Sequence, residues 1–158
     1  RYFPLLPSPV AVDWQTRLVA HLRDWGYDVL IKPHPSSHYS PPPSFSEDLG
    51  ATLIYEPFET AMRHADAFIF DSPMSTTFGV ALATAKPVTL VDYGRAVLTR
   101  EAREMLERRC SIVPARFDDE NRLQVDWNEL RDAIDASRQL TDTSFVESYL
   151  ELDPAGRM

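Results

Sequence analysis

Apolar residues along the chain fall into short continuous runs, and between these runs they recur at helical spacing. A short run that is apolar throughout is typical of a strand buried on both faces. Apolar residues three or four positions apart predict helices with one buried side. The predicted strands cover residues 27–32, 51–55, 67–70, 87–91 and 111–113. The predicted helices cover residues 14–25, 57–64, 75–84, 99–109 and 145–150, with a further helix that begins at 126.

Several helix boundaries carry recognisable signals. Asp13 is a suitable N-cap for the first predicted helix, and Gly26 is a suitable stop at its end. Pro57 suits the opening of the second helix, since its missing N–H is not needed there. Upstream of Asp13, residues 2–12 are apolar and broken by proline, which favours a short strand or a lead-in segment.

Helix and strand alternate about five times along the chain. This alternation predicts an α/β fold with a parallel sheet covered by helices on both faces. A length of 158 residues suits a single domain, here residues 1–158. Sheets of this kind bind ligands just beyond the carboxyl ends of their strands, so the residues that follow each strand are the first candidates for a site.

The charge and the cysteine content narrow the function classes. A formal net charge of −8 repels nucleic-acid backbones, so we expect no nucleic-acid partner. Cys110 is the only cysteine, which excludes an intramolecular disulfide and favours a reducing, cytoplasmic location. No apolar run is long enough to span a bilayer, although peripheral membrane association stays open. The chain begins with Arg1 rather than Met, so we expect a fragment whose amino-terminal neighbour is missing.

The first candidate strand end reads Lys32-Pro33-His34-Pro35. The two prolines stiffen the turn, and the ammonium and imidazole groups leave the strand together. Such groups offer positive charge and hydrogen-bond donors to a phosphate. The alternative is an ordinary surface turn.

The second candidate strand end runs from Asp71 through Ser72-Pro73-Met74 to Ser75-Thr76-Thr77. The first N–H groups of a helix are unpaired and, with the helix dipole, attract anions. Three hydroxyl side chains add donors. The alternative is simple N-capping, which explains one such residue well and three less well.

Other candidates are weaker. Tyr55, Pro57 and Phe58 could frame a nucleobase, but core packing of Phe58 is favoured. Arg95 follows another strand, where a solvated loop arginine is favoured. Cys110 is expected in the core rather than as a nucleophile. The histidines do not show a metal-binding spacing, and neither a glycine-rich phosphate loop nor a nucleophile elbow is present, so no metal or cofactor is predicted.

Taken in order, the motifs at 32–35 and 71–77 and the segment at 81–88 resemble the carboxyl-terminal domain of GT-B-fold transferases. The resemblance spans roughly Trp14 to Asp92. It is strongest to surface-polysaccharide enzymes: the CDP-glycerol glycerophosphotransferases, the capsule Kdo transferases and the bacterial sialyltransferases. It implies a Rossmann-like nucleotide-donor-binding domain of a metal-independent glycosyltransferase or polyol-phosphate transferase, with an amino-terminal acceptor-binding domain elsewhere. Such a domain is expected to be inactive by itself.

The resemblance also implies residue roles. His34 would contact the donor phosphate and act in catalysis, and Ser75 and Thr76 would hold the same phosphate, with Lys32 and Thr77 nearby. Families with both motifs generally use cytidine nucleotides, which favours CMP- or CDP-linked donors, with UDP-linked donors possible. One departure is Val80, where many GT-B domains place a ribose-binding Glu. A sugar-nucleotide epimerase and a non-catalytic nucleotide- or partner-binding module remain as alternatives.

Overall fold

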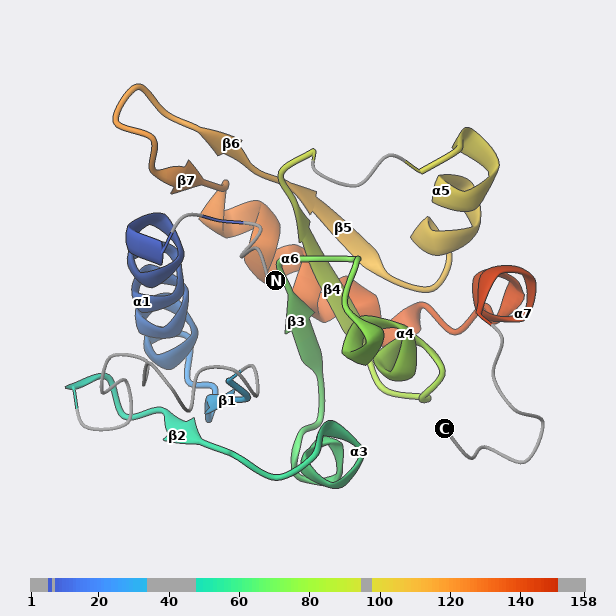
Figure 1. Cartoon of the computed structure of the whole chain (residues 1–158), viewed down its shortest axis with the longest axis horizontal. Helices are drawn as coiled ribbons and strands as arrows, with labels where there is room; N and C mark the ends of the chain where they lie inside the picture. Colours follow the sequence, from blue (N-terminus) through green and yellow to red (C-terminus); the bar gives the residue numbers. More distant parts are fainter. Residues whose placement is uncertain (1–5, 7, 34–47, 95–97, 151–158) are drawn as a thin grey trace. The chain divides into compact units, whose positions relative to one another are not determined.

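The structure is a computed structural model that describes residues 6, 8–33, 48–94 and 98–150 (Figure 1). The chain divides into two compact units. The first comprises Arg1–Ala65 with Phe117–Leu123, and the second comprises Asp66–Arg116 with Gln124–Met158. Both units contain parallel strand pairs and helices, so the predicted α/β class with parallel sheets is confirmed.

The first helix, α1 (Ser8–Asp24), begins five residues before the predicted N-cap Asp13, so that prediction and the expected strand or lead-in segment at 2–12 were wrong for residues 8–12. Pro9 falls in the first turn, where a missing N–H has no cost, and the helix therefore tolerates it. Asp13 instead lies within the helix and pairs with Arg17 at 2.7 Å, an interaction that lowers the pKa of its carboxyl.

The predicted stop at Gly26 is confirmed. Gly26 has a φ of 89°, a left-handed conformation that favours glycine. Its N–H donates to the carbonyl of Arg23 at 2.9 Å, and the N–H of Tyr27 donates to the carbonyl of Leu22 at 3.0 Å. These two bonds form a Schellman motif, which satisfies carbonyls that the helix end would leave unpaired.

Between α1 and residue 66, the described residues form short strands and a helical turn. Strand β1 (Leu30–Ile31) pairs in parallel with β2 (Thr52–Leu53). Helix α3 (Phe58–Ala61) starts after Pro57, as predicted, and continues as a 3-10 turn at Met62–His64.

The sequence pattern missed one pair of strands, β6 (Arg116–Phe117) and β7 (Leu123–Gln124). Each strand is only two residues long, too short for a period-two pattern to register. Their connection is fixed by Asp118, whose carboxylate accepts the N–H groups of Glu120 and Arg122 at 3.0 and 2.8 Å. The guanidinium of Arg17 reaches the carbonyl of Leu123 and ties this segment to α1.

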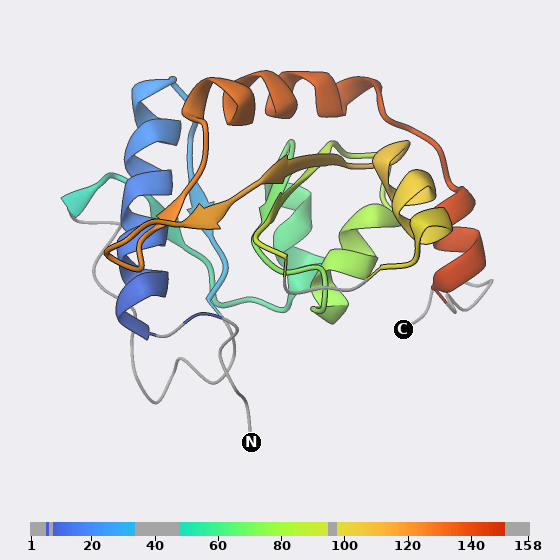
Figure 2. The same ribbon diagram turned by 90° about the horizontal axis from the view of Figure 1, so that it is seen from above.

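The second unit is built on three parallel strands in the order β3-β4-β5: β3 (Phe68–Phe70), β4 (Val88–Asp92) and β5 (Ser111–Pro114). Helix α6 (Trp127–Ala136) packs on β5 and β4 on one face, while α4 (Thr76–Leu82) lies on the opposite face (Figures 1 and 2). Helices α5 (Arg100–Glu107) and α7 (Ser144–Tyr149) pack together, and a 3-10 turn at Ser137–Gln139 extends α6.

The central strand β4 forms the middle of this core. Its residues Val88, Thr89, Leu90 and Val91 are all buried, which explains the continuous apolar run in the sequence. Among the helices of the described residues, none is both long and apolar enough to cross a lipid bilayer.

The buried side chain of Arg109 holds several backbone segments of this unit together. Arg109 is only 2% exposed. Its guanidinium donates to the carbonyls of Leu82 at 2.8 Å, Thr84 at 2.6 Å and Lys86 at 2.9 Å. Longer bonds reach the carbonyls of Ala81 at 3.3 Å and Leu140 at 3.4 Å. Arg109 thus fixes the carboxyl end of α4 and the turn into β4, and burial lowers its pKa.

Cys110 is buried, in agreement with the predicted core role, and burial raises the pKa of its thiol from 9.0 to about 12. In the unfolded chain the thiol ionises near its usual pKa, whereas in the folded protein it stays neutral. The contribution of the neutral thiol to folding stability is therefore complete below pH 9 and is lost as pH rises toward 12.

We therefore expect Cys110 alone to lower the free energy of unfolding by about 2–3 kcal/mol at about pH 11, relative to pH 8. Urea unfolding of the wild type and of Cys110→Ala, measured across this range, checks the prediction. The alanine variant lacks the titrating thiol, so the stability difference between the two proteins should change with pH. Parallel pH profiles would show that the thiol is not protected in the native state.

Candidate functional site

The strongest candidate site lies where β3 leads into α4 in the second unit. Ser75 is the N-cap of α4, and its hydroxyl oxygen accepts the N–H of Phe78 at 3.2 Å and the hydroxyl of Thr77 at 3.1 Å. The predicted helix start is therefore confirmed, and the capping interpretation holds for Ser75. Upstream, Met74 donates its N–H to the hydroxyl of Ser72 at 3.3 Å, which shapes the turn.

The first turn of α4 still offers donors beyond the cap. Within the described residues, the N–H groups of Thr76 and Thr77 have no hydrogen-bond partner, and neither does the exposed hydroxyl of Thr76. The positive end of the helix dipole adds to these groups. This arrangement can bind an anion at the carboxyl end of the sheet.

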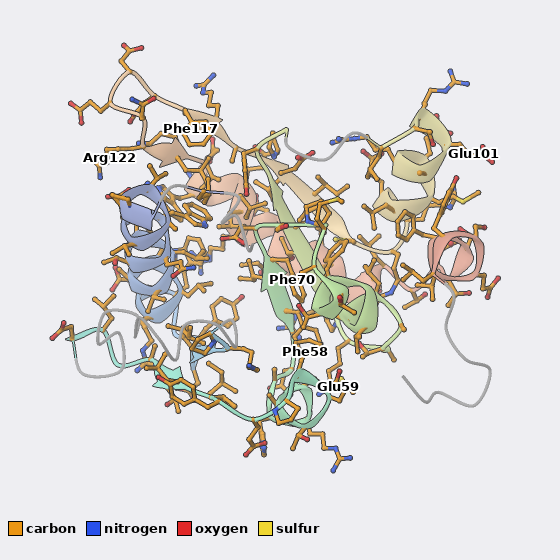
Figure 3. All side chains as sticks on the ribbon, in the orientation of Figure 1. Phe58, Glu59, Phe70, Glu101, Phe117 and Arg122 are labelled. Carbon is orange, nitrogen blue, oxygen red and sulfur yellow. The ribbon has the colours of Figure 1, made fainter. Side chains whose placement is uncertain are left out.

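An aromatic contact fixes α4 on the sheet. The ring of Phe78, on α4, meets the ring of Phe70, the last residue of β3, edge-on at 5.3 Å between centroids. Phe70 lies on β3 (Figure 3). The predicted hydroxyl residues are thus placed by a short strand, a turn and a buried aromatic pair.

A pocket of about 400 Å³ opens beside the start of α4. Ser75 and Thr76 contribute its polar part. Most of the remaining lining is apolar and comes from α4, α5, α7 and the residues just before α4, before α5 and after α7: Pro73, Met74, Phe78, Gly79, Leu82, Leu98, Leu106, Phe145, Tyr149 and Leu150. None of these described lining residues is charged, and the positive potential that they supply comes from backbone N–H groups and the dipole of α4.

The end of β4 has a different role. The carboxylate of Asp92 accepts the N–H of Gly94 at 2.9 Å and a guanidinium N–H of Arg103 at 3.0 Å. Arg103 also donates to the carboxylate of Glu107, on the same helix α5. The hydrogen bonds to Asp92 and Glu107 raise the pKa of Arg103. Asp92 therefore anchors α5 to the sheet. Arg95, the weak candidate in the following loop, lies outside the described residues.

The Lys-Pro-His-Pro motif belongs to the first unit. Lys32 is half-buried, and its ammonium donates to the carbonyl of Pro33 at 3.0 Å. His34, the predicted catalytic residue, lies outside the described residues. Its role and its association with Ser75–Thr77 therefore stay predictions.

The three nucleobase candidates differ in exposure. Phe58 is 9% exposed and belongs to the core, which fits the core-packing interpretation. Pro57 is the exposed N-cap of α3. Tyr55 is 49% exposed. Among the described residues, no group of three or more His, Cys, Asp or Glu side chains is arranged to hold a metal ion.

Sequence reasoning missed the residues that form the pocket away from α4. Leu98 and Tyr149 are far from the Ser75–Thr77 motif in the chain, and an apolar residue near a helix end gives no sign of which cavity it lines. Val80, which stands where many GT-B domains place a ribose-binding Glu, is buried.

Comparisons with known proteins do not assign the chain to a family. No protein-family model matches it, and neither does any curated protein or solved structure. A function for the chain therefore has to be inferred from its own residues and from the resemblance of their motifs.

Proposed function

We propose that the chain is the donor-binding part of a GT-B-like glycosyltransferase or polyol-phosphate transferase of surface-polysaccharide synthesis, with a Rossmann-like arrangement. In this proposal, the first turn of α4 holds the phosphate of a nucleotide-activated donor. The observation that carries it is the pair of unpaired N–H groups on Thr76 and Thr77, beside a pocket at the carboxyl end of a parallel sheet.

The chemistry of the first turn suits this role. In sugar transfer the nucleotide phosphate leaves with developing negative charge, and fixed donors that meet this charge lower the barrier. Loss of one such donor typically costs about 2.7–4 kcal/mol. The described residues that line the pocket supply N–H and hydroxyl donors but no cation. In the proposal the cations are Lys32 and His34, with His34 as the catalytic residue.

The apolar part of the pocket suits a nucleoside. Its volume of about 400 Å³ is in the range of small-molecule sites. Tyr149 is 46% exposed and lines this pocket, so its ring is available to stack on a base. We propose a cytidine nucleotide as the preferred donor, from the motif resemblance, with uridine nucleotides second.

The test is calorimetric titration of the protein with CMP, CDP, UMP and UDP, with cytidine as the control without phosphate. We expect saturable binding of at least one cytidine nucleotide at or below millimolar concentration, and much weaker binding of cytidine. A His34→Ala variant should bind more weakly if His34 contacts the phosphate. If none of the four nucleotides binds at millimolar concentration, or if cytidine binds as well as CMP, the proposal is wrong.

A further inference from the structure

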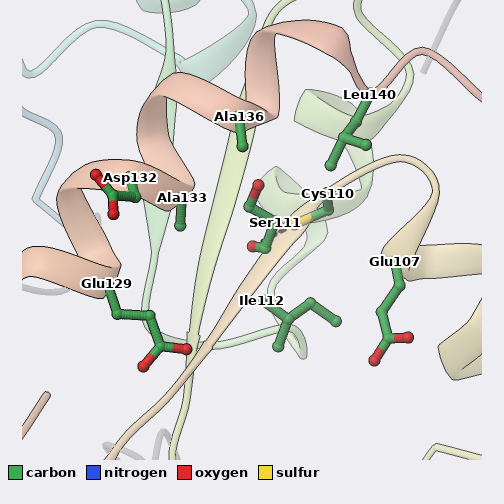
Figure 4. A pocket seen from close by; sticks show the side chains of 9 residues that line it. All are labelled: Glu107, Cys110, Ser111, Ile112, Glu129, Asp132, Ala133, Ala136 and Leu140. Carbon is green, nitrogen blue, oxygen red and sulfur yellow. Dashed lines mark hydrogen bonds between the residues drawn. The ribbon is translucent and has the colours of Figure 1, made fainter. Parts of the chain in front are cut away.

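A shallow groove of about 390 Å³ lies on another side of the second unit, between α6 and the end of α5 (Figure 4). Strand β5 runs along it and contributes Ser111 and Ile112. The described residues that line this groove are all different from those that line the candidate donor pocket, so the two sites are separate. An occupant of the groove would be additional to the donor nucleotide, and its identity does not depend on the proposed donor site.

One stripe of α6 and of the turn after it faces the groove. Its members recur at spacings of three or four residues: Glu129, Asp132, Ala133, Ala136 and Leu140. Leu130 and Ile134, on the neighbouring face of α6, are buried instead. The two alanines lie in the middle of the stripe, and their small side chains allow the axis of another helix to come close. Together with Ile112 they give the groove an apolar floor.

The rim of the groove is acidic. Glu107 lies on the α5 side, and Glu129 and Asp132 lie on the α6 side (Figure 4). Among the described residues that line the groove, none is Lys or Arg. Glu107 pairs with Arg103 at 2.9 Å, whereas Glu129 and Asp132 are exposed and have no ion pair within the described residues. The apolar floor is thus bordered by carboxylates on both sides.

The edge of β5 does not suit an added strand. Within the described part of the unit β5 pairs only with β4. The N–H of Ala115 donates to the carbonyl of Asp92 at 2.8 Å, so the backbone groups of Ile112 and Pro114 point away from β4. Pro114 has no N–H, which leaves only Ile112 to donate. Side chains of an added strand would also alternate between the two faces of the sheet and could not meet floor and rim together.

We infer that the groove binds a basic amphipathic helix of a partner protein, with an apolar stripe flanked on both sides by Lys or Arg. In such a helix the apolar stripe and its flanking cations face the same side. The stripe would pack on the floor, one row of cations would meet Glu129 and Asp132, and the other row would face Glu107. A second copy of this chain has the same formal net charge of −8 and is therefore repelled.

The experiment is fluorescence polarisation of the whole chain with a labelled peptide of about 20 residues, built from Leu-Ala-Gln-Leu-Lys-Gln-Lys repeats. We expect saturable binding, a gain of helical circular dichroism in the peptide, and weaker binding as salt is raised. A second peptide has proline in place of the central Gln between two Lys residues. It keeps every Leu and Lys but interrupts the helix, and should bind at least about tenfold more weakly.

Matched charge variants test the rim. E129Q/D132N should weaken binding of the Leu-Lys peptide about fivefold, in line with two exposed ion pairs. The control D66N/E101Q also removes one Asp and one Glu, from exposed positions of the same unit that do not line the groove (Glu101 is labelled in Figure 3). It should leave binding within about twofold of the wild type.

A second pair of variants tests the floor. A136R places a long cation where the partner helix is expected to pack, and should weaken binding at least about tenfold. Q139R adds the same charge one turn away, at an exposed residue outside the groove, and should have a much smaller effect. Equal effects within either pair of variants would overturn the inference, as would full affinity for the proline peptide or absence of binding. A dimer of the chain alone that A136R dissociates would assign the groove to a second copy instead.

Discussion

Replacement of Arg109 by Met is expected to lower the free energy of unfolding by about 3–5 kcal/mol, a large part of the stability of a domain of this size. The guanidinium is buried and donates to five backbone carbonyls around the end of α4, the turn into β4 and Leu140. Loss of the side chain would leave several of these carbonyls without a donor inside the protein.

A buried charge can sometimes be replaced by an apolar residue at no cost, but only where both partners are removed together. The partners of Arg109 are main-chain carbonyls, which no side-chain substitution can remove. Burial also disfavours the charged form of Arg109 and lowers its pKa, so the observed hydrogen bonds must already offset this desolvation. Lys keeps the charge but not the planar fork, so Arg109→Lys should fall between the wild type and Arg109→Met.

The neighbouring Arg108 provides a matched control. It is exposed and reaches Asp142 at 3.4 Å and the hydroxyl of Ser144 at 3.1 Å. Exposed pairs contribute about 0–1 kcal/mol, so Arg108→Met should change stability little. Urea unfolding of the two variants checks the difference. Similar losses for Arg108→Met and Arg109→Met would contradict a specific role for the buried guanidinium.

Most elements of this fold could be predicted from hydrophobic spacing. The strands at 67–70, 87–91 and 111–113 were visible because a central parallel strand is apolar throughout. The start of α1 was not predicted. Pro9 was interpreted as a break, although the first turn of a helix accepts proline. The two-residue strands β6 and β7 left no periodic signal at all.

The candidate site was predictable in part. The cap at Ser75 followed from a run of hydroxyl residues after an apolar strand, and the structure has this cap. The apolar pocket beside it could not be foreseen, because it forms only when α5 and α7 pack near α4. The role of Arg109 was also not predictable, since an arginine just after a helix is usually solvated, and only the tertiary fold surrounds this one with carbonyls.

Substitution of Thr76 by Glu should separate the structural role of the α4 start from its proposed ligand role. A carboxylate in the first turn interacts favourably with the helix dipole and should raise the free energy of unfolding by about 0.3–1 kcal/mol. The same carboxylate would stand where the donor phosphate is proposed to bind. Two like charges about 5 Å apart repel by about 3 kcal/mol at an effective dielectric of about 20, so CMP affinity should fall about 100-fold.

Thr76→Gln is the matched control, because it has the same length as Glu without the charge. It removes one exposed hydroxyl and should weaken CMP binding only a few-fold, with the N–H groups of the first turn left in place. Calorimetric titration with CMP and urea unfolding of both variants give the two readouts. If the Glu and Gln variants bind CMP equally well, no phosphate charge lies near the first turn of α4. A large loss for Glu alone, at unchanged or higher stability, would place the negative charge of the ligand at this helix start, because damage to the fold would lower the stability as well.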